Sequence, residues 1–130
     1  MVAPAQMVEV KNLGKTYPRG KVVALQDISF TVAKGEFISI IGPSGCGKST
    51  LIKLIGDIIE PSEGSIRVDG LDAREARLKG MFSFVFQNPV LLPWRRVIEN
   101  VSLPLEILHN ETRDPRSLLN MFRIDRRAHV

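Results

Sequence analysis

Residues 42–50 constrain the fold of this chain more than any other segment. They read GPSGCGKST and follow an almost wholly apolar run, FISII, at residues 37–41. Beyond them, apolar residues recur at helical spacing as far as residue 59. A continuous apolar run is typical of a strand that is buried on both faces. The segment therefore predicts a buried strand, a glycine-rich loop and an amphipathic helix in direct succession.

The residue types of this loop match the chemical needs of a phosphate group. Glycines let backbone N–H groups turn inward without a Cβ in the way, and the start of the following helix favours an anion. We expect Lys48 to reach the β- and γ-phosphates, Ser49 to place its hydroxyl on Mg²⁺ and Thr50 to contact the α-phosphate. The alternative is a glycine-rich turn without a ligand. The predicted nucleotide-binding residues of this P-loop are Gly42, Pro43, Ser44, Gly45, Cys46, Gly47, Lys48, Ser49 and Thr50.

The remaining elements predict an α/β fold, a P-loop core with an antiparallel addition. Alternating strands are expected at 7–11, 28–32 and 65–70, a second apolar strand at 81–86, and one or two helical turns at 73–78. Residues 97–108 are weakly helical and interrupted by Pro104, and Asp114-Pro115 is typical of a helix start. We expect residues 1–87 to form the nucleotide-binding core with its antiparallel β subdomain, and residues 88–130 to begin a helical subdomain.

The composition of the chain indicates the cellular compartment in which it works. No run of 18 apolar residues is present, the N-terminus lacks the features of a signal peptide, and the single cysteine, Cys46, fits a reducing compartment without needing a redox role. These features favour the cytoplasm. The formal charge is +4, with arginines gathered near the end, which fits a solvated helix face better than a nucleic-acid contact. Those arginines are Arg113, Arg116, Arg123, Arg126 and Arg127.

Several motifs in order resemble the ATP-binding subunit of ABC transporters. They read LQDISFTVAKGE, IIGPSGCGKSTLIKLI, EPSEGSIRVDG and FVFQNPVLLPW, and the resemblance runs from about residue 8 to residue 105. It implies an ATPase that binds ATP and Mg²⁺ at the cytoplasmic face of the membrane as a peripheral subunit. The implied partners are a membrane permease subunit, a second ATP-binding subunit and, indirectly, an external solute-binding protein, with no nucleic acid. The phrase PVLLPWRRVIENVSLPLEIL is most similar to importers of nitrate, sulfonate, taurine and thiamine precursors.

The resemblance also implies roles for single residues outside the loop. Tyr17 is similar to the aromatic residue that stacks on adenine, the alternative being a turn tyrosine that packs on the sheet. Gln87 resembles the glutamine that approaches Mg²⁺ and the attacking water, the alternative being an amide that caps a strand. Residues 88–97, which include Leu91, Leu92 and Trp94, match the surface that contacts the membrane subunit. Taken alone, Trp94 is equally typical of a core residue.

The chain also departs from the family pattern. Gly56-Asp57-Ile58 replaces the usual Ala-Gly-Leu, with little expected effect because aspartate tolerates the left-handed conformation. No signature motif, no acidic strand end and no switch histidine is found, and His109 and His129 are interpreted as surface residues. We therefore expect a chain cut before the signature, inactive in hydrolysis by itself and with an apolar sheet edge left uncovered beside 37–41. The alternatives are a complete, non-catalytic nucleotide-binding interaction protein and a soluble ABC-type ATPase that acts on nucleic acid.

Overall fold

The computed structural model describes residues 5–18, 21–108 and 114–123. The chain divides into two compact units, residues 1–84 and 85–130, and each is described by itself. None of the described helices is both long and apolar enough to cross a membrane. His109 and His129 lie outside the described residues, as do Arg113, Arg126 and Arg127. The functional boundary after residue 87 stays a prediction.

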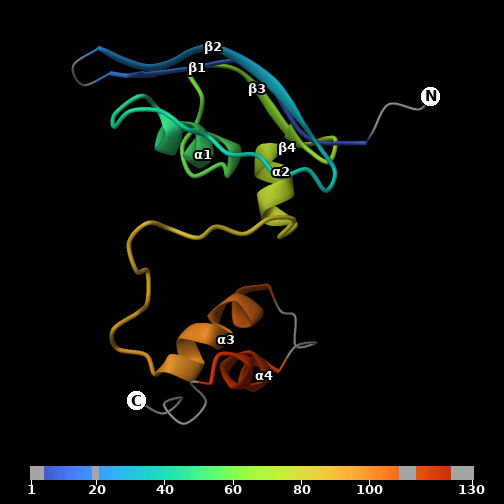
Figure 1. The fold of residues 1–130 in the computed structure, drawn as a ribbon, viewed down its shortest axis with the longest axis vertical. Helices are drawn as coiled ribbons and strands as arrows, with labels where there is room; N and C mark the ends of the chain where they lie inside the picture. Colours follow the sequence, from blue (N-terminus) through green and yellow to red (C-terminus); the bar gives the residue numbers. More distant parts are fainter. Residues whose placement is uncertain (1–4, 19–20, 109–113, 124–130) are drawn as a thin grey trace. The chain divides into compact units, whose positions relative to one another are not determined.

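The first unit is built on a four-stranded antiparallel sheet with strand order β2-β1-β3-β4 (Figure 1). The strands are β1 (Gln6–Tyr17), β2 (Val22–Ala33), β3 (Glu63–Val68) and β4 (Leu71–Asp72). Val10 of β1 pairs with Phe30 of β2 on one side and with Ile66 of β3 on the other. The alternating segments at 7–11, 28–32 and 65–70 therefore contribute strands, as predicted, and β1 and β2 extend well beyond the predicted bounds.

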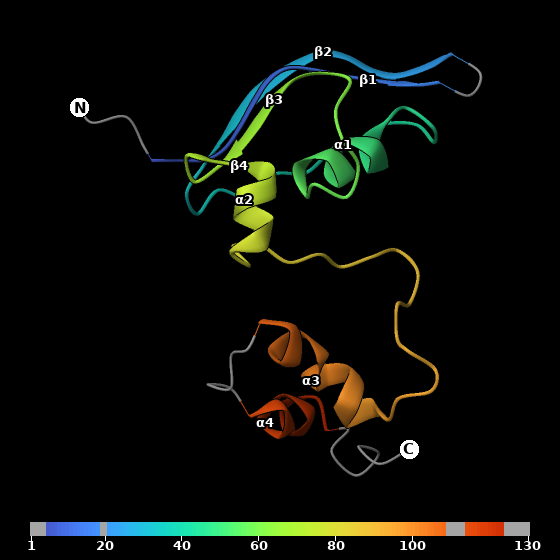
Figure 2. The same cartoon turned by 180° about the vertical axis from the view of Figure 1, so that it is seen from behind.

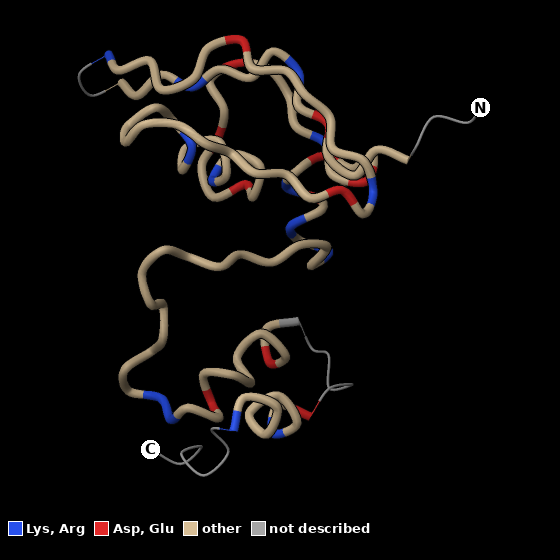
Figure 3. Tube along the Cα trace, in the orientation of Figure 1, with Lys and Arg blue, Asp and Glu red and all other residues tan. Residues whose placement is uncertain are grey.

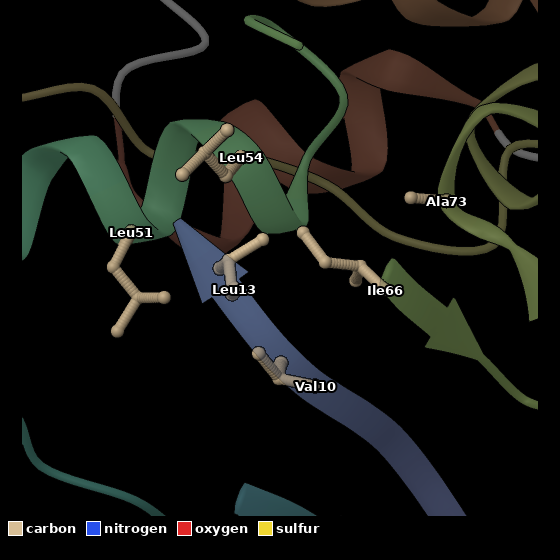
Figure 4. Packing of buried hydrophobic residues seen from close by; sticks show 6 residues of the cluster. All are labelled: Val10, Leu13, Leu51, Leu54, Ile66 and Ala73. Atoms are coloured by element: carbon tan, nitrogen blue, oxygen red, sulfur yellow. The ribbon is translucent and has the colours of Figure 1, made fainter. Parts of the chain in front are cut away.

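Two helices cover one face of this sheet, as both views show (Figures 1 and 2). They are α1 (Lys48–Ile55) and α2 (Ala73–Leu78). The side chain of Asp72 caps α2 by accepting a hydrogen bond from the Arg74 N–H at 2.9 Å. The core lies between helix and sheet, where α1 places two leucines against β1 and β3 (Figure 4). Its buried members are Val10, Leu13, Leu51, Leu54, Ile66 and Ala73. This packing fixes the start of α1, and hence the end of the loop before it, relative to the sheet.

Helix α1 ends at Ile55, earlier than the apolar spacing predicts. Asp57 adopts a left-handed conformation with φ of 51°, and the N–H of Ile58 donates to the Lys53 carbonyl at 2.9 Å. This is the Schellman geometry that glycine usually supplies. The Asp57 carboxylate also accepts a hydrogen bond from Arg77 Nε of α2 at 2.9 Å. The residue before it, Gly56, leaves the space that the ring of Phe84 occupies.

The two apolar strands predicted at 37–41 and 81–86 are wrong for the described structure. Neither segment is a strand, and Phe37 and Ile41 are 92% and 91% exposed instead of buried on both faces. A strand needs a neighbour to satisfy its backbone N–H and C=O groups, and neither segment pairs with any of the four described strands. Local apolar character was therefore not enough to make either segment a strand. Residues 37–41 are exposed, whereas Phe82 and Phe84 of the second segment are half-buried.

The second unit contains α3 (Val97–Leu108) and α4 (Pro115–Met121). Pro104 was expected to interrupt the first of these, but α3 runs through it as one helix. The predicted start of α4 is confirmed, because Asp114 accepts a hydrogen bond from the Arg116 N–H at 2.9 Å and Pro115 is the first helical residue. Among the apolar residues of α4, Leu119 alone is buried.

Candidate nucleotide-binding site

The last residue of the P-loop before α1, Gly47, lies against β2. Gly47 has φ of 97°, a conformation that side chains rarely adopt. A Cβ placed on it would lie 2.6 Å from the Ala24 carbonyl oxygen and 2.8 Å from Leu25 Cδ2. Both the backbone conformation and the close approach therefore require glycine at this position.

The loop curls so that its two ends approach each other. A Cβ on Gly42 would lie 2.9 Å from Cys46 Sγ, and the Cys46 N–H donates to the Pro43 carbonyl at 3.4 Å. Between them, Gly45 has φ of 80° and open space around it. The loop is thus a narrow turn with bare backbone inside, and Ser44, Gly45 and Cys46 are exposed.

The ammonium of Lys48 lies inside this turn. Its Nζ donates hydrogen bonds of 2.6 Å to the carbonyl oxygens of Gly42 and Pro43, and it lies 3.3 Å from Cys46 Sγ. The first helical hydrogen bond runs from the Leu51 N–H to the Gly47 carbonyl at 2.9 Å. The N–H groups of the preceding residues have no partner further back within the helix, as at every helix start. One cation and several free donors therefore meet at the same place.

Ser49 and Thr50 occupy the first turn of α1, with Ser49 exposed and Thr50 half-buried. Among the described residues no group of three or more His, Cys, Asp or Glu side chains could hold a metal ion. Oxygen ligands suit Mg²⁺, which usually binds through few protein groups together with phosphate oxygens and water. The Ser49 hydroxyl therefore fits Mg²⁺ only as an ion that is shared with a bound phosphate.

Tyr17 is the last residue of β1, and its backbone pairs with Val22 of β2. The side chain is 36% exposed, and Lys15 Nζ lies 5.4 Å from its ring centroid. Tyr17 belongs to the same compact unit as the P-loop, which lies beside this end of the β1–β2 hairpin in both views (Figures 1 and 2). The first unit thus brings Tyr17 and all the loop residues to one end of the sheet.

Gln87 belongs to the second unit, where it is exposed and lies outside any helix or strand. The loop belongs to the first unit, and the two units are described separately. The alternative interpretation of Gln87, an amide that caps a strand, loses its basis because residues 81–86 form no strand. Its role at Mg²⁺ stays a prediction.

The segment after Gln87 presents apolar side chains to solvent. Val90 and Leu91 are exposed, and Trp94 is 77% exposed, which rules out a core role for Trp94 within its unit. Asn100 holds this segment through its side chain, which accepts from the Leu92 N–H at 2.7 Å and donates to the carbonyls of residues 92, 95 and 96. Sequence reasoning missed this asparagine, because its partners are backbone groups that only the folded turn brings together.

Glu99 also supports the start of α3, since its carboxylate accepts a hydrogen bond from the Arg96 N–H at 2.8 Å. A glutamate three residues after the residue that precedes a helix is half of a capping box. Sequence reasoning missed this cap, although the spacing of Arg96 and Glu99 could have indicated it.

Charges do not gather on one part of the described chain. Lys and Arg positions alternate with Asp and Glu positions along the traces of both units (Figure 3). Nucleic-acid binders usually cluster basic residues on one face or helix. Three of the five arginines near the end lie outside the described residues, so the interpretation of that cluster as a solvated face stays a prediction.

Comparison with known proteins identifies the family. A family model described as "ABC transporter" matches residues 25–130. The chain belongs to the ABC transporter family. The predicted resemblance is confirmed, and so is the predicted fold class, a P-loop ATPase cassette with an antiparallel sheet. Members of this family generally bind and hydrolyse ATP.

Individual relatives of this ABC cassette are ATP-binding proteins of import systems. The chain is 46% identical over 98 residues to the nitrate import ATP-binding protein NrtC of Synechococcus elongatus, covering 75% of this chain and 15% of that protein. It is 39% identical over 103 residues to the spermidine/putrescine import ATP-binding protein PotA of Mycoplasma genitalium, covering 78% and 18%. The chain thus spans less than a fifth of each of these two relatives.

A solved structure with the same fold is the dimeric ATP-binding cassette MJ0796 in a post-hydrolysis state bound to ADP and Pi. The TM-score is 0.80 at 34% identity, and the match covers 95% of this chain and 60% of that chain. The described arrangement of loop, helix and sheet is therefore that of an ATP-binding cassette.

Proposed function

We propose that this chain is the ATP-binding part of an ABC importer and that residues 42–50 hold the phosphates of ATP. The observation that carries the proposal is the position of Lys48 Nζ inside a turn of bare backbone, within 2.6 Å of two loop carbonyls. A half-buried cation next to the unpaired backbone N–H groups of a helix start is complementary to a polyphosphate.

The contacts of Lys48 suggest how a phosphate enters. An ammonium has three hydrogens, and two of them are directed to the carbonyls of Gly42 and Pro43. The third faces the Cys46 sulfur at 3.3 Å. Sulfur is a weak acceptor, so a phosphate oxygen replaces this contact at little cost while the two carbonyls keep the lysine in place.

The other site residues complete the proposed binding. Ser49 would hold Mg²⁺ together with the phosphates, and the ion would supply positive charge that neutralises their oxygens. Thr50, half-buried in the same helical turn, is suited to the α-phosphate. The exposed ring of Tyr17 is suited to stacking on the adenine. Gln87 would approach Mg²⁺ and the attacking water, as in the family pattern.

The proposed partners are a permease subunit and a second ATP-binding subunit, with the chain peripheral at the cytoplasmic face of the membrane. The exposed Val90, Leu91 and Trp94 support a protein partner on the segment after Gln87, because apolar side chains at a surface gain from being covered. The Asn100 hydrogen bonds support it too, since they hold the turn that presents Trp94.

The transported solute is proposed as a small one such as nitrate, sulfonate, taurine or a thiamine precursor. The relative at 46% identity is named for nitrate, which supports this class. A relative at 39% is named for spermidine and putrescine. Solute choice is proposed to lie with the permease and the solute-binding protein.

The decisive experiment titrates the purified chain with Mg-ATP by calorimetry and compares two lysines of α1. Lys48→Ala should abolish binding, because a charged hydrogen bond contributes about 1.5–3 kcal/mol and the site loses its cation. Lys53→Ala is the matched control, since Lys53 is exposed at the other end of the same helix. Equal ATP affinities of the Lys48→Ala variant and the unmodified chain would remove the proposal.

A second measurement concerns turnover. Hydrolysis by ABC cassettes relies on charge stabilisation and on an oriented water, and the sequence has neither a signature motif nor an acidic strand end. We expect no steady phosphate release from Mg-ATP by the 130 residues alone. Turnover that disappears in Lys48→Ala would contradict this and would direct attention to Gln87.

A further inference from the structure

We propose that Lys15 is a positioning residue for the nucleotide base. In this proposal Lys15 holds the ring of Tyr17 from one side, so that the opposite ring face is ready to stack on a purine. The proposal rests on the proposed function, because it assumes that Tyr17 and the P-loop bind the same nucleotide.

Lys15 is held between two partners. Its Nζ donates a 2.6 Å hydrogen bond to the backbone carbonyl of Glu60, and the same atom lies 5.4 Å from the centroid of the Tyr17 ring. A cation within about 6 Å of a ring centroid is attracted by the electrons of the ring face. Lys15 is half-buried, whereas Tyr17 is exposed. The lysine thus supports one side of a ring that remains open to solvent.

The contacts of Lys15 and its neighbours join the end of β1 to the segment that follows α1, the helix that carries Lys48. Glu60 lies in the segment after α1, and the next part of that segment is bonded to the same end of β1. The Ser62 N–H donates to the Gly14 carbonyl at 2.9 Å, and the Thr16 N–H donates to Ser62 Oγ at 3.1 Å. The strand end that bears Tyr17 is therefore tied to the chain leaving α1 at three places.

The same strand end also contacts the loop itself through β2. Lys15 pairs with Leu25, whose side chain lies against Gly47 at the end of the P-loop. Tyr17 follows Lys15 by two residues, or about 7 Å along a strand. The phosphate loop, Leu25, Lys15 and Tyr17 thus form a continuous series of contacts within one compact unit. A ligand held at its phosphates by the loop would have its base within reach of this ring.

A ring that is already oriented loses less freedom when a base stacks on it. The cation also occupies one ring face, which leaves a single face for the base. Neither effect depends on the hydrogen-bonding edge of the base, so Lys15 should assist adenine and guanine alike. It should have no effect on a ligand that lacks a base.

The test measures the Kd of Mg-ATP and of inorganic tripolyphosphate for three variants. Lys15→Met keeps the length of the side chain without its charge, and we expect about a two- to fivefold rise in the Kd of ATP with unchanged tripolyphosphate binding. Lys15→Arg retains the cation and should bind ATP like the unmodified chain. Lys11→Met is the matched control, because Lys11 lies on the same strand and pairs with Glu9 instead.

A spectroscopic measurement separates positioning from general stability. Tyr17 is the single tyrosine of the chain, so fluorotyrosine labelling gives one ¹⁹F resonance that reports this ring. Lys15→Met should shift and broaden it before any ligand is added, and Lys11→Met should not. In the Tyr17→Ala background, Lys15→Met should no longer change the Kd of ATP.

Three outcomes would overturn the inference. They are an unchanged Kd of ATP in Lys15→Met, an equal loss of ATP and tripolyphosphate binding, and additive effects of Lys15→Met and Tyr17→Ala. Failure of the proposed function is distinguishable, because it would appear as unchanged ATP binding in Lys48→Ala whatever Lys15 does.

Discussion

Residues 37–41 and 42–50 are neighbours in the chain, yet only the second segment adopts the structure that its residue pattern predicts. The P-loop forms a narrow turn and leads, as predicted, into a helix whose leucines are buried. The apolar run before it forms no strand and leaves Phe37 and Ile41 almost fully exposed. Both predictions rested on local residue patterns, and they differ in what the predicted structure needs from elsewhere.

The hydrogen bonds that hold the P-loop turn are made mainly by residues of the loop and of the helix that follows it. Lys48 bonds to carbonyls five and six residues before it, and the helix forms its own ladder. A central strand, in contrast, needs partners on both sides, and none of the described strands supplies one to 37–41. Local chemistry was sufficient for the first segment and insufficient for the second.

The largest expected effect contrasts a buried with an exposed apolar residue of the first unit. Leu54 is 1% exposed in the core, so Leu54→Ala should lower the free energy of unfolding by about 2–5 kcal/mol. Phe37→Ala should change the free energy of unfolding by no more than about 0.5 kcal/mol, because this exposed side chain buries little apolar surface. Urea titration followed by circular dichroism measures both. Similar losses in the two variants would mean that residue 37 is packed after all.

The next effect tests why the loop needs glycine, with two glycines of the same loop as a matched pair. Gly47→Ala combines a strained φ, costing about 1–3 kcal/mol, with a clash against Ala24, and should remove ATP binding. Gly45→Ala meets no atom within 4 Å, so only the backbone strain remains. Calorimetric titration should therefore rank Gly45→Ala between Gly47→Ala and the unmodified chain. The reverse order would show that space around the loop does not limit it.

A smaller effect concerns the exposed run. The double change Phe37→Ser and Ile41→Ser removes two large apolar side chains from solvent while leaving the core intact. It should lower binding of the dye ANS and slow aggregation, with a stability change within about 0.5 kcal/mol. Light scattering and dye fluorescence at equal protein concentration provide the measurement. Undiminished dye binding would place the exposed apolar surface elsewhere, with Val85 and Trp94 as the next candidates.

The last prediction concerns the other end of α1. Asp57→Ala keeps the left-handed strain and loses the hydrogen bond to Arg77, and should cost about 1 kcal/mol. In Asp57→Gly, relief of the strain offsets the lost ion pair, so its stability should stay within about 0.5 kcal/mol of the original. Thermal unfolding measures the stability loss of each variant. Equal losses would show that the ion pair, not the backbone conformation, governs this turn.

Much of the site was open to sequence reasoning because its chemistry is local. The glycine spacing predicted the turn, and the predicted caps at Asp57 and Asp114 are seen as a left-handed residue and an N-cap. The roles of Asn100 and Lys15 were not predictable. Asn100 bonds to four backbone groups of a turn, and Lys15 meets a carbonyl 45 residues away. No residue pattern along the chain predicts such contacts.

The sequence by itself determined the P-loop, the helix after it, the antiparallel strands and the family, because each follows from residue types at short and regular spacing. Tertiary structure alone decided which apolar segments become strands and which side chains surround Tyr17. The reason is physical: strand pairing and side-chain clustering depend on what the rest of the fold brings alongside. Residues 37–41 have the composition of a buried strand, and in this structure they lack the neighbours that would make them one.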